Sequence, residues 1–292
     1  MKAQWRARSG IDTGGGNGIY WVRILKSLPN GNLYIENLPE AARKEIPKIQ
    51  SEVERDLVYP LLRGKDVERW KATPFEYIIV PHGPTTGMEA FSDEIMKINY
   101  PKTFNYFLRM KSHISCRRTL KIFGGSTKYW YSLFKIGKYT FSPYKVVWKE
   151  IAKDFVASVV SSIEDNFLGK KNVLPDHKLM LTPCKSRSEA SYLCAILNSC
   201  VARALVKSYA VETQISTHVL KYMKIPAFSE QNSVHRKLAS LSKKANESAE
   251  RKDTGELRLV ESKIDETVAF DLYGLSDKEL SSLRESLKLL LS

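Results

Sequence analysis

The segment Tyr139-Thr140-Phe141-Ser142-Pro143-Tyr144-Lys145-Val146-Val147-Trp148 places aromatic and β-branched residues on both sides of a single proline. Such residues favour extended chain, whereas the Ser142-Pro143 pair favours a turn. The pattern predicts two strands, Tyr139–Phe141 and Lys145–Trp148, with Phe141 and Trp148 in a core. The middle of the chain is therefore expected to contribute to a β-sheet.

The sequence before this segment predicts further strands and one helix. The glycine-rich loop at residues 10–18 leads into the strand-like residues 19–22, and it fits either a tight turn or a close backbone approach to a phosphate. Residues 77–81 read as a short buried strand. Helical periodicity predicts a helix over residues 102–117. One face of this helix carries Phe104, Phe107, Leu108 and Ile114, and the other carries Lys102, Arg109, His113 and Arg117.

The sequence after it changes from mixed to helical. Residues 178–181 predict a strand, and Ser186 with Glu189 has the spacing of a capping box. That box opens a helix with the buried stripe Leu193, Ile196, Leu197, Cys200, Ala204 and Leu205. From Asn232 two apolar stripes predict a helical hairpin with a loop at residues 246–255, and Ser276 caps a third helix after Gly274. We predict an α+β fold, with one domain at 1–228 and a helical section at 229–292.

Positive charge is concentrated in one part of the sequence. Of 46 basic and 32 acidic residues, twelve basic and no acidic residues lie between Lys97 and Lys149. Without this segment the chain has 34 basic against 32 acidic residues, so the segment supplies most of the net charge of +14. The same segment holds thirteen aromatic residues. Cations interleaved with aromatics are typical of a surface that binds a polyanion.

Composition excludes several other classes of protein. No apolar run approaches the roughly 20 residues that span a bilayer, and the first residues lack the apolar core of a signal peptide. The basic segment is not a continuous amphipathic helix, so we expect no membrane partner. Neither a Cys-x-x-Cys pair nor a zinc-type Cys/His spacing is present, so we expect no metal site. The four cysteines are interpreted as reduced core thiols of an intracellular, cytoplasmic protein.

Sequence motifs for catalysis are largely absent. An N6-adenine methyltransferase needs a glycine-rich cofactor loop after a strand and an Asn/Asp-Pro-Pro-Tyr/Phe motif, and the sequence has neither. The triplet Asp176-x-Lys178 fits a Mg-dependent nuclease, but no suitable acidic residue precedes it. We therefore assign no catalytic residue and no cofactor to this chain, and keep a stand-alone nuclease as an alternative.

Five segments together resemble a known family. They are residues 12–21, residues 57–67, residues 139–148, Pro175-Asp176-His177-Lys178-Leu179 and residues 192–199. In this order they resemble the C-terminal specificity region of TaqI-like N6-adenine methylases and of type IIG restriction–modification enzymes. Ile225-Pro226 before a long helix is also similar to the recognition domains of type I specificity subunits.

The resemblance implies a target-recognition domain that reads bases in double-stranded DNA. In that family the catalytic motifs and the S-adenosylmethionine site belong to a methyltransferase domain, which this chain lacks. The chain is then a fragment, a separate subunit or a remnant that acts with a methyltransferase domain or subunit. Methylation by this chain alone is not expected.

The predicted DNA contacts come from the acid-free segment. Arginine pairs well with guanine, whereas lysines and loop N–H groups hold phosphates, but the pattern does not separate these two roles. Tyr129 and Trp130 fit a core position as well as a contact. A single-strand or RNA binder, with bases stacked on the aromatics, remains an alternative. The predicted contacts are Lys102, Arg109, Arg117, Arg118, Lys121, Lys128, Tyr129, Trp130, Tyr131, Lys138, Tyr144 and Lys145.

Overall fold

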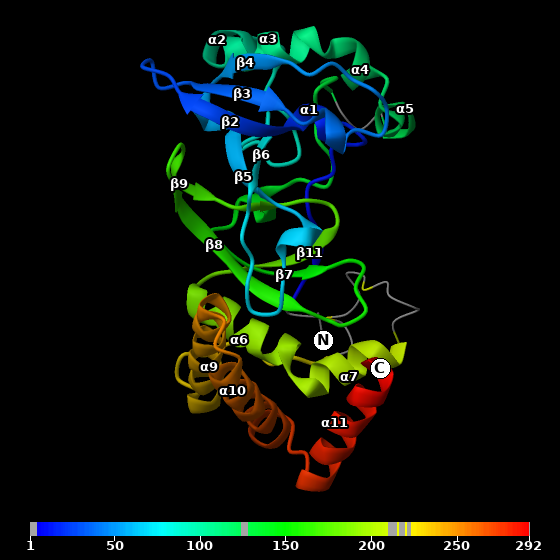
Figure 1. Ribbon diagram of the computed structural model, residues 1–292, viewed down its shortest axis with the longest axis vertical. Helices are drawn as coiled ribbons and strands as arrows, with labels where there is room; N and C mark the ends of the chain where they lie inside the picture. The colour runs from blue at the N-terminus through cyan, green and yellow to red at the C-terminus, as the bar shows by residue number, and fades with distance from the viewer. Residues whose placement is uncertain (1–4, 124–127, 210–214, 216–219, 221–222, 292) are drawn as a thin grey trace.

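Two β-sheets and two groups of helices form the α+β fold. The computed structural model describes residues 5–123, 128–209, 215, 220 and 223–291, and at residues 118, 121, 123 and 209 it describes the backbone alone. Figure 1 shows an elongated molecule in three tiers. Helices α2 to α5 lie at the top with strands β2 to β4, strands β7, β8 and β11 lie in the middle, and helices α6, α7, α9, α10 and α11 lie at the bottom.

Six strands form the upper sheet in the order β10-β5-β6-β2-β3-β4. β10 is parallel to β5, and the other neighbours are antiparallel. In β2 the side chains of Val22 and Ile24 are buried while those of Arg23 and Leu25 are exposed, so one face meets a core and the other meets solvent. The strands are β2 (Trp21–Ser27), β3 (Leu33–Asn37), β4 (Gln50–Val53), β5 (Val58–Leu62), β6 (Glu76–Ile79) and β10 (Leu174–Pro175).

Five strands form the other sheet in the order β1-β11-β7-β8-β9, with antiparallel neighbours throughout. An apolar cluster joins the two sheets, because Leu62 of β5 packs with Val147 of β7 and Leu181 of β11. The strands are β1 (Arg8–Ser9), β7 (Tyr144–Lys149), β8 (Ala157–Asp165), β9 (Gly169–Asn172) and β11 (Leu179–Cys184).

The upper helices pack their aromatic side chains onto the six-stranded sheet. Phe104 and Phe107 of α3 share a core with Ile35 and Val58. Glu54 receives hydrogen bonds from the N–H groups of residues 102 and 103, both 2.8 Å, so a carboxylate already satisfies the first turn of α3. The helices are α1 (Asn17–Tyr20), α2 (Asp93–Asn99), α3 (Pro101–Arg109), α4 (Lys111–Ser115) and α5 (Arg118–Phe123).

The lower helices share a core with the five-stranded sheet. Trp148 of β7 lies in one apolar cluster with Leu193 of α6, Leu238 of α9 and Ile264 of α10. The division at residue 228 stays a prediction, but the helices after it bury their apolar faces against residues before it. The lower helices are α6 (Arg187–Asn198), α7 (Cys200–Tyr209), α9 (Ser233–Arg251), α10 (Thr254–Glu266), the π-helical η6 (Thr267–Leu272) and α11 (Asp277–Leu291).

Short 3-10 helices connect several of these elements. They are η1 (Pro39–Ala41), η2 (Arg55–Leu57), η3 (Gly64–Asp66) and η5 (Lys138–Phe141). The strand predicted at residues 139–141 is therefore wrong. Thr140 N–H donates to the carbonyl of Gly137, and the Thr140 hydroxyl accepts from Gly137 N–H, so this pair closes a helical turn.

Other predicted boundaries are also wrong. Residues 19 and 20 belong to α1 and not to a strand, and the helix predicted to run through Leu205 breaks at Ser199, between α6 and α7. The helix predicted over residues 102–117 breaks at Met110, whose N–H donates to Phe107 three residues back, and Leu108 is 42% exposed instead of buried. The loop predicted at 246–255 is mostly helix. α9 continues to Arg251 and ends where Lys252 takes a left-handed conformation (φ 59°), so this residue makes the turn and Gly255 does not.

Candidate nucleic-acid interface

Arg117 joins three segments that are far apart in the sequence. Its guanidinium donates to the carbonyls of Thr13 (2.6 Å), Trp130 (2.9 Å) and Ser132 (3.0 Å), and its Nε donates to Ile114 (2.9 Å). The side chain is only 5% exposed. The prediction that Arg117 lies on an exposed helix face is wrong, because the interior carbonyls attract it there. Its role is to position the loops at residues 12–16 and 128–136.

The glycine-rich loop at residues 12–16 is a tight turn beside Phe134. Gly14 has φ 64° and its N–H donates to Asp12 Oδ1 at 2.8 Å. A Cβ atom on Gly14 would lie 2.8 Å from the Phe134 ring, so the position requires glycine. Gly15 follows with φ 96° and is exposed. The loop thus presents open backbone next to the second loop.

Two exposed lysines of the second loop line a hollow on the surface, and a third exposed lysine follows them in the sequence. Lys128 and Lys135 line it, and Lys138 follows at the start of η5. A hydrogen bond to Tyr129 raises the pKa of Lys128, so this side chain carries its charge at neutral pH. The hollow has a volume of about 280 Å³. Its lining is Met88, Glu89, Ala90, Lys128, Ser132, Leu133, Phe134, Lys135 and Ile136.

Met88 and Glu89 are candidate contacts that sequence reasoning missed. Met88 is 80% exposed and Glu89 is exposed beside it. The preceding run Gly83-Pro84-Thr85-Thr86-Gly87 is a turn signal that could have marked this loop as exposed. Nothing local in the sequence places it against residues 128–136. That contact depends on the bridge between His82 and Ala90 and on the bond from Leu133 N–H to His82 Nε2 (3.0 Å).

The aromatic residues of the second loop belong largely to the core. Tyr131 is 0% exposed, and its hydroxyl donates to the carbonyl of Phe91 at 2.7 Å. Its ring stacks on those of Phe107 and Tyr129. Tyr129 and Trp130 are half-buried against the same cluster. The prediction of Tyr131 as a surface contact is therefore wrong, because the hydroxyl and both ring faces have interior partners.

Lys145 is also an interior residue. It is 0% exposed, and its Nζ donates to the carbonyls of Ser142 (2.6 Å) and Val173 (2.9 Å). Burial lowers the pKa of this amine to about 7. Lys145 lies on the same face of β7 as Val147, which packs between the two sheets, so the prediction that Lys145 lies on the surface is wrong. Tyr144 beside it is half-buried.

The cations of α3 lie against acidic or carbonyl groups of β4. Lys102 is exposed, and its Nζ lies 3.8 Å from Glu52 Oε2. Arg109 is exposed and donates to the carbonyl of Gln50 at 3.2 Å. Arg118 and Lys121 belong to α5, but their side chains lie outside what the structure describes. The predicted contacts thus fall into an α3 group, an α5 group and the lysines around the hollow.

The nuclease triplet makes structural contacts. Asp176 is 3% exposed, and its Oδ1 accepts from the N–H of Lys178 at 3.0 Å. Burial raises the pKa of Asp176 to about 7. Lys178 Nζ lies 3.7 Å from Glu150. Within the described residues no three His, Cys, Asp or Glu side chains are grouped so as to hold a metal ion.

The cysteines and the longest apolar helices test two expectations from the sequence, the reduced core thiols and the absence of a membrane-spanning helix. All four cysteines are free; Cys184, Cys194 and Cys200 are buried, but Cys116 is exposed and is not a core thiol. Over the described ranges no single helix is long and apolar enough to cross a membrane. α6 and α7 pass that test only as a pair bent by 60°.

Comparison with known proteins adds one structural likeness. No protein-family model and no curated protein matches this sequence. Among solved structures, the type IIL restriction–modification enzyme MmeI, determined in complex with DNA, is similar with a TM-score of 0.58 and 10% sequence identity. The match covers 98% of this chain and 35% of the MmeI chain, so this chain spans about a third of that enzyme. The likeness shows a common fold along nearly the whole chain.

Proposed function

We propose that this chain is a double-stranded DNA recognition domain of a restriction–modification system. In this proposal it chooses the DNA sequence, and a methyltransferase domain or subunit supplies S-adenosylmethionine and the N6-adenine chemistry. The fold shared with a DNA-bound restriction–modification enzyme over 98% of the chain is the observation that supports it most. The resemblance of the five sequence segments to specificity regions supports it independently.

The proposed contact surface is the hollow between the loops at 83–90 and 128–138. Lys128, Lys135 and Lys138 would hold phosphates, because exposed lysines on loops can follow a strand's backbone. Glu89, which is exposed at the same hollow, offers a hydrogen-bond acceptor for a base edge. Lys102, Arg109, Arg118, Lys121, Tyr129, Trp130 and Tyr144 stay predicted contacts. Arg117, Tyr131 and Lys145 are left out because they are buried.

Salt dependence of DNA binding tests this surface. Removing one cation that neutralises a phosphate should reduce the slope of log K against log salt by about 0.9. Changing Lys128, Lys135 and Lys138 together to alanine should therefore reduce the slope by about 1.8 through Lys128 and Lys138, and by less than about a further 0.9 through Lys135, whose Nζ lies 3.7 Å from Asp12. The same change should weaken binding to a random duplex of about three helical turns. Fluorescence anisotropy of a labelled duplex over a salt series measures both quantities.

A charge-matched control separates this site from general electrostatics. Lys244 of α9 and Lys278 and Lys288 of α11 are also exposed, and Figure 1 shows α11 at the opposite end of the molecule from α5. The control triple alanine variant should keep the wild-type slope. Equal slopes for both triple variants would reject the surface. Tighter binding of single-stranded RNA than of duplex DNA in competition would reject the proposed function.

A further inference from the structure

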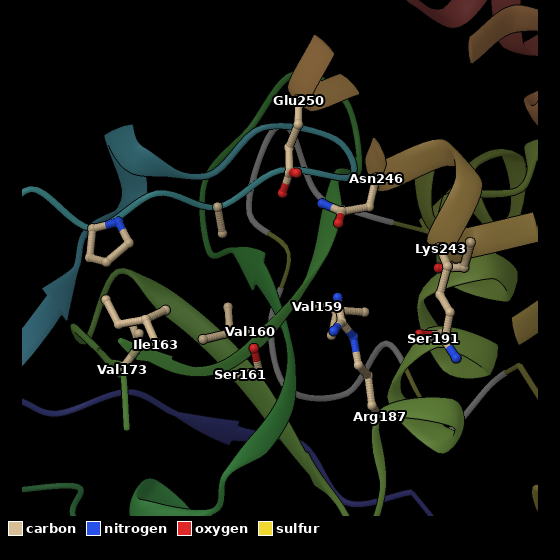
Figure 2. Close-up of a pocket in the computed structure, with 13 residues that line it drawn as sticks. Val159, Val160, Ser161, Ile163, Val173, Arg187, Ser191, Lys243, Asn246 and Glu250 are labelled. Carbon is tan, nitrogen blue, oxygen red and sulfur yellow. The ribbon is translucent and has the colours of Figure 1, made fainter. Parts of the chain in front are cut away.

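A second hollow lies between β8 and the helices α6 and α9. Its volume is about 140 Å³, and three of the side chains that line it, Arg187, Lys243 and Glu250, are exposed, so the hollow opens to solvent and would hold part of a ligand. The strand side of the hollow is apolar, with Val160, Ile163 and Val173. Figure 2 shows these side chains on one side and the polar side chains of the two helices on the other.

The polar wall presents groups of opposite character. Arg187 extends into the hollow from α6, whereas Asn246 and Glu250 extend into it from α9 (Figure 2). Ser191 and Ser242 line it as buried side chains, each 2% exposed. The hollow therefore offers a guanidinium donor, a carboxylate acceptor and an amide that can do either.

The charged groups of this wall are not used by the fold. In the part of the chain that the structure describes, the side chains of Arg187 and Glu250 are exposed and make no ion pair or hydrogen bond with the protein. Other arginines of the same helical region do pair: Arg203 with Asp154 at 2.6 Å and Arg251 with Glu256 at 2.6 Å. Asn246 donates its Nδ2 to the carbonyl of Trp70 at 2.8 Å, which fixes the amide and leaves its oxygen free as an acceptor.

We propose that this hollow binds a guanine base. Guanine has two acceptors, O6 and N7, which an arginine can contact with both its amino groups. The ring edge on the far side of O6 carries N–H donors, which a carboxylate such as Glu250 accepts. One ring face would pack on the wall formed by Val160, Ile163 and Val173, as flipped bases pack on apolar side chains. A base that lacks either the pair of acceptors or the N–H donors would leave Arg187 or Glu250 without a partner.

Lys243 extends the site to a phosphate. It lines the hollow and is exposed on α9, one helical turn before Asn246. A guanosine monophosphate could therefore place its base in the hollow and its phosphate near this amine. The same base could come from a free nucleotide or from an unpaired guanine in a nucleic acid strand. The inference rests on this hollow alone and does not depend on the proposed DNA surface.

Calorimetric titration of the full chain with guanosine and adenosine monophosphates tests the proposal. We expect saturable binding of the guanine nucleotide and about a tenfold preference over the adenine nucleotide. Glu250→Gln should abolish this preference, and Arg187→Met should weaken binding of the guanine nucleotide. Glu247→Gln, an exposed change on the same helix outside the hollow, is the matched control and should bind as wild type.

Two duplexes identify the source of the base. Preference for a duplex with one unpaired guanine over the fully paired duplex, lost in Glu250→Gln, supports a base within a strand. Equal binding of both duplexes, with saturable binding of the free nucleotide, supports the nucleotide itself. Absence of saturable nucleotide binding together with equal binding of the duplexes overturns the proposal, and so does identical behaviour of Glu250→Gln and Glu247→Gln. An unfolding midpoint for each variant confirms that it is folded.

Discussion

Lys145→Met should change how the stability of this protein depends on pH. Lys145 is 0% exposed, and its ammonium has two carbonyl partners, from Ser142 and Val173, without an acid within ion-pair distance in the described residues. Burial alone lowers its pKa from 10.5 to about 7. Methionine has a similar length and no charge, so the substitution removes the titration while filling most of the same space.

The sign of the effect follows from proton binding. Between pH 7 and pH 10.5 the unfolded chain holds a proton on Lys145 that the folded chain has lost. The free energy of unfolding of the wild type therefore rises with pH in this window, by about 1.4 kcal/mol per pH unit and by about 5 kcal/mol in total. Below pH 7 both states are protonated, and this contribution no longer changes. The two carbonyls left without a donor in the variant lower its stability by about 1–3 kcal/mol each at every pH.

Urea unfolding is followed by tryptophan fluorescence at pH values of about 7, 8, 9 and 10. It measures the difference in free energy of unfolding between the wild type and Lys145→Met. Subtracting the free energies of unfolding of the two proteins at each pH cancels the contribution of every other titrating group. The free energy of unfolding of the wild type should rise relative to that of the variant as the pH rises. Lys138→Met, an exposed position, controls for the loss of a positive charge. Parallel stability curves for wild type and Lys145→Met would refute the assignment of a neutral buried amine.

Two further substitutions test how the loops are held. Arg117→Met should lower the free energy of unfolding by about 4 kcal/mol in urea titration, because four buried carbonyls lose their donor; a loss below about 1 kcal/mol would contradict its positioning role. Gly10→Ala should cost more than about 3 kcal/mol, because its Cβ would overlap the carbonyl oxygen of Asp176. Gly64→Ala is its control, since the nearest atom lies at 3.6 Å and a thermal melt should show a change equivalent to less than about 1 kcal/mol.

The sequence correctly predicted the helix caps, two core aromatic residues and one strand. Ser186 accepts from Glu189 N–H at the start of α6, and Ser276 and Glu279 exchange bonds before α11, as the capping spacing indicates. Phe141 and Trp148 are in the core as predicted, at 5% and 0% exposure. The strand predicted at 178–181 is confirmed by β11. These features depend on residues within a few positions of one another.

The errors come from contacts between distant segments. Helical periodicity places Arg117 on a polar face, but it cannot show that the carbonyls of Thr13 and Ser132 lie within reach. The β-branched and aromatic residues around Lys145 mark a strand correctly, but only the carbonyls of Ser142 and Val173 explain why a lysine can occupy an inward position. A long side chain with a polar end can be satisfied inside a fold whenever carbonyls converge on it. Such convergence is a property of the tertiary structure.

The same reasoning changes what the acid-free segment means. The segment contains no acidic residue, but the fold places acidic residues of other segments beside its lysines. Lys102 lies 3.8 Å from Glu52, and Lys135 lies 3.7 Å from Asp12. Twelve cations counted along the chain would imply a salt slope of about 11 for duplex DNA. Arg117 and Lys145 cannot release counterions because they are buried, and the paired lysines must first exchange a carboxylate for a phosphate. The slope of the whole chain should therefore lie well below that count, because the cations that contribute fully are those that the fold leaves exposed and unpaired.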